Sequence, residues 1–316
     1  MRALRWCLCG ALLMAGWMMV GAASARPDLS RKTGPTLADT GSKAYAFHTL
    51  KFDSEDGRRH YRVRVAVPKG AVPQAGFPAL YLLDGNAALM ELDEAALQRQ
   101  RDGGHPPVLV FIATDNDLRI DGDARAFDYT PRPLAGAGRD NALGRKNGGA
   151  DAFLTLIRTR VQPGVAALVK LDATRQTLWG HSYGGLFVLH VLFTQPQAFS
   201  RYVAVDASLW WEQGQILGEE RGLLKRKALP APASLLLMTG SGGEAARSGP
   251  PGADPKRVQA MQVARGAVSA DEPVRMIERL SQLSRLQARL QVLPDLSHGQ
   301  TLGASLPAAM DFAGAP

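Results

Sequence analysis

Runs of consecutive apolar residues recur along the chain and predict strands that are buried on both faces. The clearest run covers residues 79–83 and ends at Asp84. Buried parallel strands have this pattern because helices cover both sides of their sheet. Further runs of this type lie at 108–113, 177–179, 202–205 and 234–239, with a shorter one at 290–293. By contrast, residues 61–67 alternate large apolar residues with arginine or alanine, which predicts a half-exposed antiparallel strand.

Helical patterns separate the predicted strands. One covers residues 87–100, and a second covers 151–169, with Asp151 at its N-cap and Pro163 interrupting it. A third covers 273–288, where valine, isoleucine and leucine form an apolar stripe. Strands that alternate with helices predict the α/β class, with a mainly parallel sheet and helices on both of its faces.

Two segments do not fit this alternation. Residues 210–232 follow a strand and are partly charged, which predicts a cap or lid inserted into the fold. Residues 240–256 are rich in glycine, serine, alanine and proline, which predicts a mobile loop. Loops of this length in a compact domain are usually functional or disordered.

The first 25 residues have the three parts of an export signal. Arg2 and Arg5 form the positive end, residues 10–22 are apolar, and residues 23–25 have the small side chains after which signal peptidase cleaves. The apolar part is shorter than the roughly 20 residues of a spanning helix, so a cleaved signal is favoured over an uncleaved anchor. We therefore expect a periplasmic protein with no stable membrane insertion, and secretion beyond the periplasm is the alternative.

Cleavage after Ala25 changes the composition in two ways. Cys7 and Cys9 are the two cysteines of the 316 residues, and both leave with the signal, so no disulfide or cysteine ligand remains. The formal charge falls from +8 to +6 because two arginines are removed. In the remaining chain we expect a flexible leader over residues 26–42, which are rich in proline, glycine, serine and threonine, and a single folded domain over residues 43–316.

Residues 180–184 read Gly-His-Ser-Tyr-Gly, which is the G-x-S-x-G pattern of a nucleophile elbow. In such an elbow the serine lies on a sharp turn between a strand and a helix, with its Oγ exposed. The glycines allow neighbouring backbone to pass close to it. A predicted strand precedes the pattern, and the apolar residues 186–189 begin a helix after it. Ser182 is therefore the predicted nucleophile.

A serine nucleophile needs a general base, and in elbow-type hydrolases the histidine follows the serine along the chain. His298 lies in a polar loop after the last short strand, where the base is expected. His181 lies within the elbow and His190 lies on the helix after it, so structural roles are expected for both.

The acid that orients the base is less well determined by the sequence. It should follow the strand at 234–239, which makes Glu244 the first candidate. Asp254, further along the same loop, and Asp206, after the preceding strand, compete with it. A dyad without an acid is a further alternative, in which a weaker partner orients His298.

An oxyanion hole should complete the site. One donor is expected to be the backbone N–H of Tyr183, directly after the nucleophile. The second should come from the loop after Leu83, near Gly85 and Asn86, because Gly85 allows close approach of the backbone.

With these residues placed, the chain resembles the putative-esterase family of α/β-hydrolases, and within it the periplasmic esterases of enterobactin and salmochelin trilactones. The resemblance rests on four stretches in the order of the family, at 81–86, 125–131, 180–185 and 296–299. It covers roughly residues 45–312. The elbow is shared by a whole superfamily, whereas the stretch that begins at Arg125 and contains Asp-Tyr-Thr-Pro is more particular.

The resemblance implies an α/β-hydrolase fold in which Ser182 and His298 carry out the hydrolysis. It also implies that Arg125 lies at the mouth of the site and meets an anionic substrate. From the sequence alone, an ion pair with Asp121 or Asp123 is the alternative for this arginine.

The segment after the strand at 202–205 departs from the family. Asp206-Ala207-Ser208 stands where the family often has Ser-Pro-Ser, which leaves Asp206 as a polar participant in the site. Trp210 is a candidate for stacking on aromatic groups of the substrate, although tryptophans pack in cores more often.

These features predict a serine esterase that hydrolyses a siderophore trilactone through an acyl-enzyme. A general periplasmic carboxylesterase of aryl, acyl or cinnamoyl esters and a noncatalytic binder of ferric siderophores are the alternatives. The expected partner is a small ester whose ferric form is an anion, which a positively charged protein attracts. No cofactor or metal is expected, since no cluster of His, Asp and Glu has ligand spacing. Nucleic acid is not expected either, because the basic residues are scattered.

Overall fold

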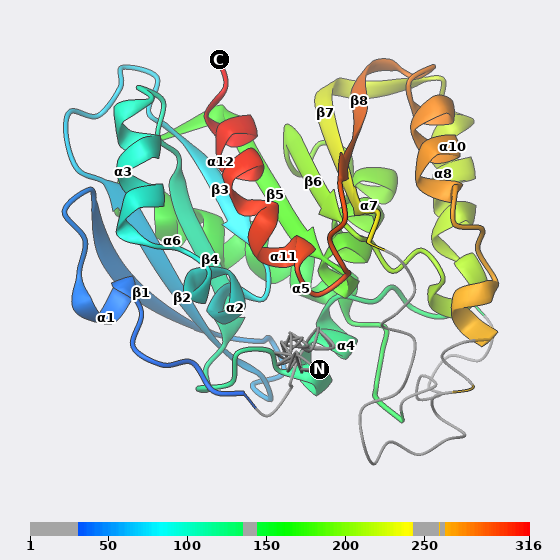
Figure 1. The fold of residues 1–316 in the computed structure, drawn as a ribbon, viewed down its shortest axis with the longest axis horizontal. Helices are drawn as coiled ribbons and strands as arrows, with labels where there is room; N and C mark the ends of the chain where they lie inside the picture. The colour runs from blue at the N-terminus through cyan, green and yellow to red at the C-terminus, as the bar shows by residue number, and fades with distance from the viewer. Residues whose placement is uncertain (1–30, 135–143, 243–258, 260–262) are drawn as a thin grey trace, which may run out of the picture.

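The computed structural model describes residues 31–134, 144–242, 259 and 263–316. Within these residues, an eight-stranded sheet has the order β1-β2-β4-β3-β5-β6-β7-β8 (Figure 1). The strands β3 to β8 run parallel, and β2 is antiparallel to its neighbours β1 and β4. The strands are β1 (Tyr45–Asp53), β2 (His60–Pro68), β3 (Phe77–Leu82), β4 (Val108–Thr114), β5 (Leu171–His181), β6 (Arg201–Val205), β7 (Ala228–Gly240) and β8 (Ser284–Leu293).

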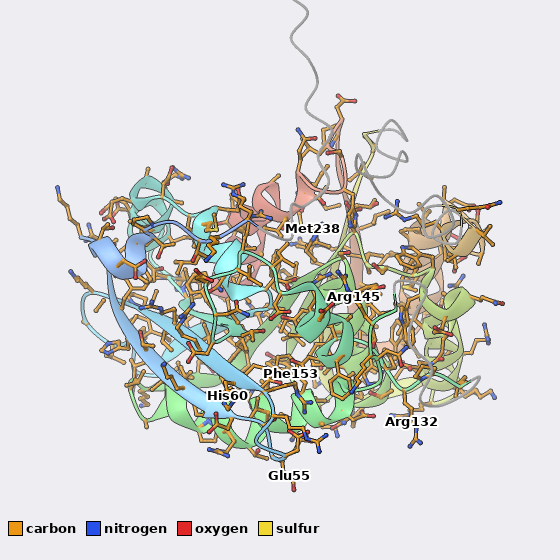
Figure 2. The ribbon with its side chains drawn as sticks, turned by 90° about the horizontal axis from the view of Figure 1, so that it is seen from below. Glu55, His60, Arg132, Arg145, Phe153 and Met238 are labelled. Carbon is orange, nitrogen blue, oxygen red and sulfur yellow. The ribbon has the colours of Figure 1, made fainter. Side chains whose placement is uncertain are left out.

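Helices cover both faces of this sheet. One face carries α2 (Gly85–Met90), α3 (Glu94–Asp102), α11 (Thr301–Ala304) and α12 (Leu306–Gly314) (Figure 1). The other face carries α5 (Ala150–Leu156), α6 (Gln162–Ala166), α7 (Tyr183–Thr194), α8 (Ile216–Leu224) and α10 (Glu272–Leu280). Phe153 and Met238 lie on opposite sides of the sheet (Figure 2) and belong to the two separate hydrophobic cores.

The parallel strands are apolar on both faces because both faces are covered. Every residue of β3 is buried. Along this strand Ala79 and Tyr81 pack into one core, while Leu80 and Leu82 pack into the other. Burying one leucine side chain on folding contributes about 1.5–3 kcal/mol to the free energy of unfolding. A shift by one residue would exchange the two faces, so both cores hold the strands in register.

The predicted strands are present, and the structure corrects three other assignments. The helix predicted over 87–100 is divided into α2 and α3. The helix predicted over 273–288 ends at Leu280, and β8 begins at Ser284. Leu283 and Leu286 are buried in the same core as α10, so their spacing matched a helical stripe although a turn and a strand present them. The strand β1 was not predicted.

The segment 210–232 forms part of the main helical layer and no lid. It contains a 3₁₀ turn at Trp211–Gly214, then α8, and it ends inside β7. Ile216 and Leu223 of α8 are fully buried in the core that α7 also enters. Arg279 of α10 forms an ion pair with Glu220 of α8, with 2.8 Å between Nη2 and Oε2. The apolar residues of this segment are therefore used in packing.

Several predictions concern segments at the margins of the described residues. The export signal at 1–25 and residues 243–256 of the predicted mobile loop lie outside them. Residues 31–42 of the predicted flexible leader contact the domain, since Lys32 forms a β-bridge with Leu118. Leu37, in α1 (Leu37–Thr40), packs against the core beneath α2 and α3. In the part of the chain that the structure describes, none of the helices is both long and apolar enough for a bilayer crossing.

His190 joins three helices on one face of the sheet. It lies buried in α7, with Nδ1 2.7 Å from Glu219 Oε2 of α8 and Nε2 3.3 Å from Asp151 Oδ1 of α5. Burial lowers the pKa of His190, but the hydrogen bonds with Asp151 and Glu219 outweigh it and raise the pKa to about 9. With a carboxylate at each ring nitrogen, the imidazole is protonated at neutral pH. Asp151, predicted as an N-cap, lies in the first turn of α5.

We expect the free energy of unfolding to decrease by about 2–3 kcal/mol as this imidazolium loses its proton. The folded pKa of about 9 exceeds the unfolded value, so the stabilisation is complete below about pH 6.5 and is lost as the pH rises through about 9. Urea unfolding of the wild type and of His190→Gln at about pH 6 and pH 9.5 measures this effect. A variant with the same pH dependence as the wild type would contradict the assignment.

Candidate active site

The turn from β5 into α7 has the geometry of a nucleophile elbow. Ser182 lies between the two elements with φ 61° and ψ −114°, in a backbone region that non-glycine residues rarely adopt. The glycines around it are required by close backbone contacts. A Cβ on Gly180 would lie 2.3 Å from the carbonyl oxygen of Gly184, and one on Gly185 would lie 2.9 Å from that of Val205. The turn can therefore form only with glycine at both positions.

The structure brings Ser182 and His298 together across 116 residues of sequence. His298 lies in the loop between β8 and α11, with Nε2 3.1 Å from Ser182 Oγ. This distance is within hydrogen-bond reach of a nucleophile and its base. Ser208 Oγ lies 3.3 Å from the same Ser182 Oγ.

His181 holds the backbone of the loop that carries the base. Its Nε2 donates a hydrogen bond of 2.7 Å to the carbonyl oxygen of His298, and the two rings are 4.6 Å apart. Burial and the neighbouring His298 lower the pKa of His181 well below its ordinary value, so it stays neutral. The structural role expected for this residue fits these contacts.

Of the candidate acids, Glu244 and Asp254 lie outside the described residues, and Asp206 lies beside the base. Asp206 Oδ2 is 3.7 Å from His298 Nδ1. Burial raises the pKa of Asp206, but contacts with His298, Thr301 and the backbone of Gly240 outweigh it and lower the pKa below the ordinary value.

His181, Asp206 and His298 form a compact group of three possible metal ligands, which sequence spacing did not predict. One ligand atom from each lies within 4.8 Å of the others. The Nε2 atoms of both histidines already have partners, because His298 pairs with Ser182 and His181 with a carbonyl. These contacts favour proton transfer over cation binding at this group.

Two helices begin at or near the elbow, where an oxyanion hole is expected: α7 begins directly after Ser182, and a Cβ on Gly184 would lie 3.8 Å from Oδ2 of Asp84, the residue before α2. Tyr183 is the first residue of α7 and Gly85 is the first residue of α2, so their N–H groups have no acceptor within their own helices. A Cβ on Gly85 would lie 2.5 Å from backbone atoms of Phe111 and Ile112. Gly85 is therefore needed because α2 begins directly against β4.

Arg125 is paired, but with neither of the aspartates considered from the sequence. Arg125 lies in α4 (Gly122–Asp128), where its Nε donates to Asp84 Oδ1 and its Nη2 donates to Asp84 Oδ2, each at 2.9 Å. Nη2 also donates to the carbonyl oxygen of His181 at 3.1 Å. Asp121 instead caps α4, and Asp123 pairs with Arg145. Because Asp84 precedes Gly85, Arg125 fastens the oxyanion loop to the elbow.

Trp210 borders a cavity next to the base. Its ring is half-buried, 6.0 Å from the ring of Tyr183, and the guanidinium carbon of Arg265 lies 5.7 Å from the tryptophan ring. The cavity has a volume of about 270 Å³, and both polar and apolar side chains line it. Its lining includes Asp206, His298, Arg265, Trp210, Leu209, Leu237, Met238 and Pro273. An aromatic group would find an apolar face there.

The sequence of the chain matches a known family over residues 54–265, through the family model described as "Putative esterase". The chain belongs to this esterase family. The apo-salmochelin esterase of Escherichia coli is 46% identical to it over 190 residues, which is 58% of each chain. The ferri-bacillibactin esterase of Bacillus subtilis is 33% identical over 171 residues, 52% of this chain and 59% of the relative. The chain thus spans less than two thirds of the length of these curated relatives.

Solved structures of similar proteins extend the match to most of the chain. The enterobactin and salmochelin hydrolase IroE is 33% identical with a TM-score of 0.64, and the match covers 89% of this chain and all of that one. The BES protein from Bacillus cereus is 26% identical with a TM-score of 0.68, covering 85% and 95% of the two chains. The predicted α/β-hydrolase fold is confirmed.

We expect Arg125→Gln to lower the free energy of unfolding by about 3–5 kcal/mol, because it leaves the buried carboxylate of Asp84 without its partner. Ester turnover should fall as well, since the loop before Gly85 loses its anchor. The double variant Asp84→Asn/Arg125→Gln should recover part of the stability, which urea unfolding of the four proteins measures as a coupling energy. An Arg125→Gln protein of wild-type stability with only a raised KM would show instead that the arginine mainly binds substrate.

Proposed function

We propose that this protein is a serine esterase that hydrolyses the ester bonds of a siderophore trilactone of the enterobactin and salmochelin type. The observation that carries the proposal is the pairing of Ser182 Oγ with His298 Nε2 at 3.1 Å, on a nucleophile elbow. It occurs in a chain whose similar relatives carry the names of siderophore esterases and hydrolases. The geometry of the site supports ester hydrolysis, and the names of the relatives support the substrate class.

The first half-reaction forms an acyl-enzyme. His298 Nε2 takes the proton of Ser182 Oγ as this oxygen attacks the ester carbonyl carbon. Negative charge develops on the former carbonyl oxygen, where the N–H groups of Tyr183 and Gly85 stabilise it. The C–O bond to the alcohol then breaks, and the imidazolium gives its proton to the departing oxygen.

The second half-reaction returns the enzyme to its starting state. His298 takes a proton from a water molecule, and the hydroxide oxygen attacks the acyl carbon. The bond to Ser182 Oγ breaks, Oγ regains a proton from the imidazolium, and the carboxylic acid leaves. A cyclic trilactone is opened by the first such cycle, and further cycles shorten the linear product.

Ser182→Ala should reduce the hydrolysis of iron-free and ferric enterobactin by about 10⁴-fold or more, because no other group replaces the nucleophile. Chromatographic analysis of the products measures the rate. Ser208→Ala is the matched control, since its hydroxyl lies 3.3 Å from Ser182 Oγ but does not contact His298 through any described hydrogen bond. It should retain activity within about tenfold of the wild type. Equal losses in both variants would contradict the assignment of Ser182.

The same assays separate the proposal from its alternatives. Rapid hydrolysis of short p-nitrophenyl esters without cleavage of either form of enterobactin would identify a general carboxylesterase. Tight binding of the ferric siderophore with no labelling by a fluorophosphonate probe would identify a noncatalytic binder.

We expect Trp210→Ala to raise the KM for enterobactin by about tenfold, corresponding to roughly 1.4 kcal/mol of lost contact with an aromatic acyl group. The KM for p-nitrophenyl acetate should change by less than about threefold, because its acyl group is too small to reach the tryptophan. Trp210→Phe keeps an aromatic face, so its KM for enterobactin should lie between the values of the wild type and of Trp210→Ala. Steady-state kinetics with both esters measures the difference, and equal changes for the two substrates would refute a role in recognition.

A further inference from the structure

We infer that Asp206 is the positioning residue that orients His298 and stabilises its protonated form during ester hydrolysis. The inference rests on the proposed reaction at Ser182 but not on the identity of the natural ester. Asp206 Oδ2 lies 3.7 Å from His298 Nδ1, on the side of the ring opposite to the nucleophile. The three side chains thus stand in the order of a catalytic triad, although the acid follows β6 and not β7.

The carboxylate of Asp206 is fixed by donors from two different segments. Oδ1 accepts hydrogen bonds from the backbone N–H of Gly240 at 3.0 Å and from Thr239 Oγ1 at 3.1 Å, both at the end of β7. Oδ2 lies 2.6 Å from Thr301 Oγ1, at the start of α11. A carboxylate held by such donors remains ionised and keeps its direction, as its lowered pKa also indicates.

The topology explains how a residue after β6 reaches the base. Val205, the last residue of β6, pairs with His181 of β5 on one side and with Met238 of β7 on the other. Asp206 therefore leaves the sheet between the elbow strand and the end of β7. Its φ of 41° is in the left-handed region, which aspartate tolerates better than most residues. This turn brings the carboxylate under the loop that carries His298.

Other charged and titratable groups around the pair do not take the place of this carboxylate. His181 of β5 is neutral and donates to the backbone of His298. Arg125 of α4 is paired with Asp84, and Arg265 lines the adjacent cavity. Among the described residues, Asp206 is the carboxylate within ion-pair distance of His298.

The distance of 3.7 Å is longer than a hydrogen bond but within the range of an ion pair. A small rotation of the imidazole would bring Nδ1–H to Oδ2 while Nε2 stays near Ser182. When Nε2 takes the serine proton, the ring becomes positive, and the ionised carboxylate stabilises it without accepting a proton itself. The proton on Nε2 then passes to the leaving alcohol, so Asp206 begins and ends the cycle as a carboxylate.

Asp206→Asn should lower kcat by roughly 10²–10⁴-fold, with KM changed by less than about threefold, because the amide keeps the shape but loses the charge. The matched control is Asp172→Asn, since Asp172 is also a largely buried aspartate held by a threonine, a backbone N–H and an arginine, far from Ser182. The control should keep kcat within about twofold. Both variants are assayed on enterobactin, on p-nitrophenyl acetate and by the rate of fluorophosphonate labelling.

Labelling and aryl-ester turnover report on Ser182 whatever the natural substrate is, so a wrong siderophore proposal and a wrong role for Asp206 give different results. A folded Asp206→Asn protein whose kcat and labelling rate stay within threefold of the wild type would overturn the inference.

If the Asp206→Asn variant does not fold, proton NMR of the wild type at low pH tests whether His298 Nδ1 donates a hydrogen bond to Asp206. We expect a strongly deshielded Nδ1 proton that disappears in His298→Ala, which distinguishes it from the protons of His190. Its absence would overturn the inference as well.

Discussion

The bidentate ion pair between Arg125 and Asp84 is the constraint on which the geometry of the site depends. Asp84 and Arg125 have side chains that are 4% and 14% exposed, so each charge depends on the other for its solvation. The guanidinium lies near the rings of Tyr129 and Tyr183 and donates to the carbonyl oxygen of His181. One side chain thus ties the loop after β3, the helix α4 and the elbow after β5 to each other. The two expected oxyanion donors belong to segments that this pair joins.

The parallel sheet explains why these segments meet. The residues of the site follow the carboxyl ends of β3, β5, β6 and β8, which lie at one edge of the sheet. Adjacent strands are about 4.8 Å apart, so side chains that leave neighbouring strands at this edge come within contact distance. Glycine at 180 and 185 permits the backbone to turn there without steric conflict. The hydrophobic cores on both faces hold the strands in place and leave this edge for polar chemistry.

The sequence predicted the local parts of this site better than its long-range parts. Ser182 and the helix after it follow from a motif whose requirements are met within ten residues, and His298 from the order of the catalytic groups along the chain. The partner of Arg125 could not be found in this way, because Asp84 is 41 residues away and comes near through the pairing of β3 with β4, the strand that precedes α4. Similarly, α10 and β8 share an apolar spacing that fits one long helix, and the pairing of β8 with β7 decides where the helix ends.

Binding of the proposed substrate, if its ferric form is an anion, would depend on the charges at the site and not on the net charge of the protein. The resemblance to the esterase family placed Arg125 at the mouth of the site, but its charge is balanced by Asp84 and its donors are directed at protein oxygens. Asp206 adds a negative charge beside the base, which would repel an anion close to His298. Arg265 lines the cavity together with apolar side chains, and its guanidinium carbon lies 5.7 Å from the ring of Trp210. In the proposed reaction, an aromatic arm of the substrate would pack its ring against Trp210, which leaves the ester carbonyl free to approach Ser182.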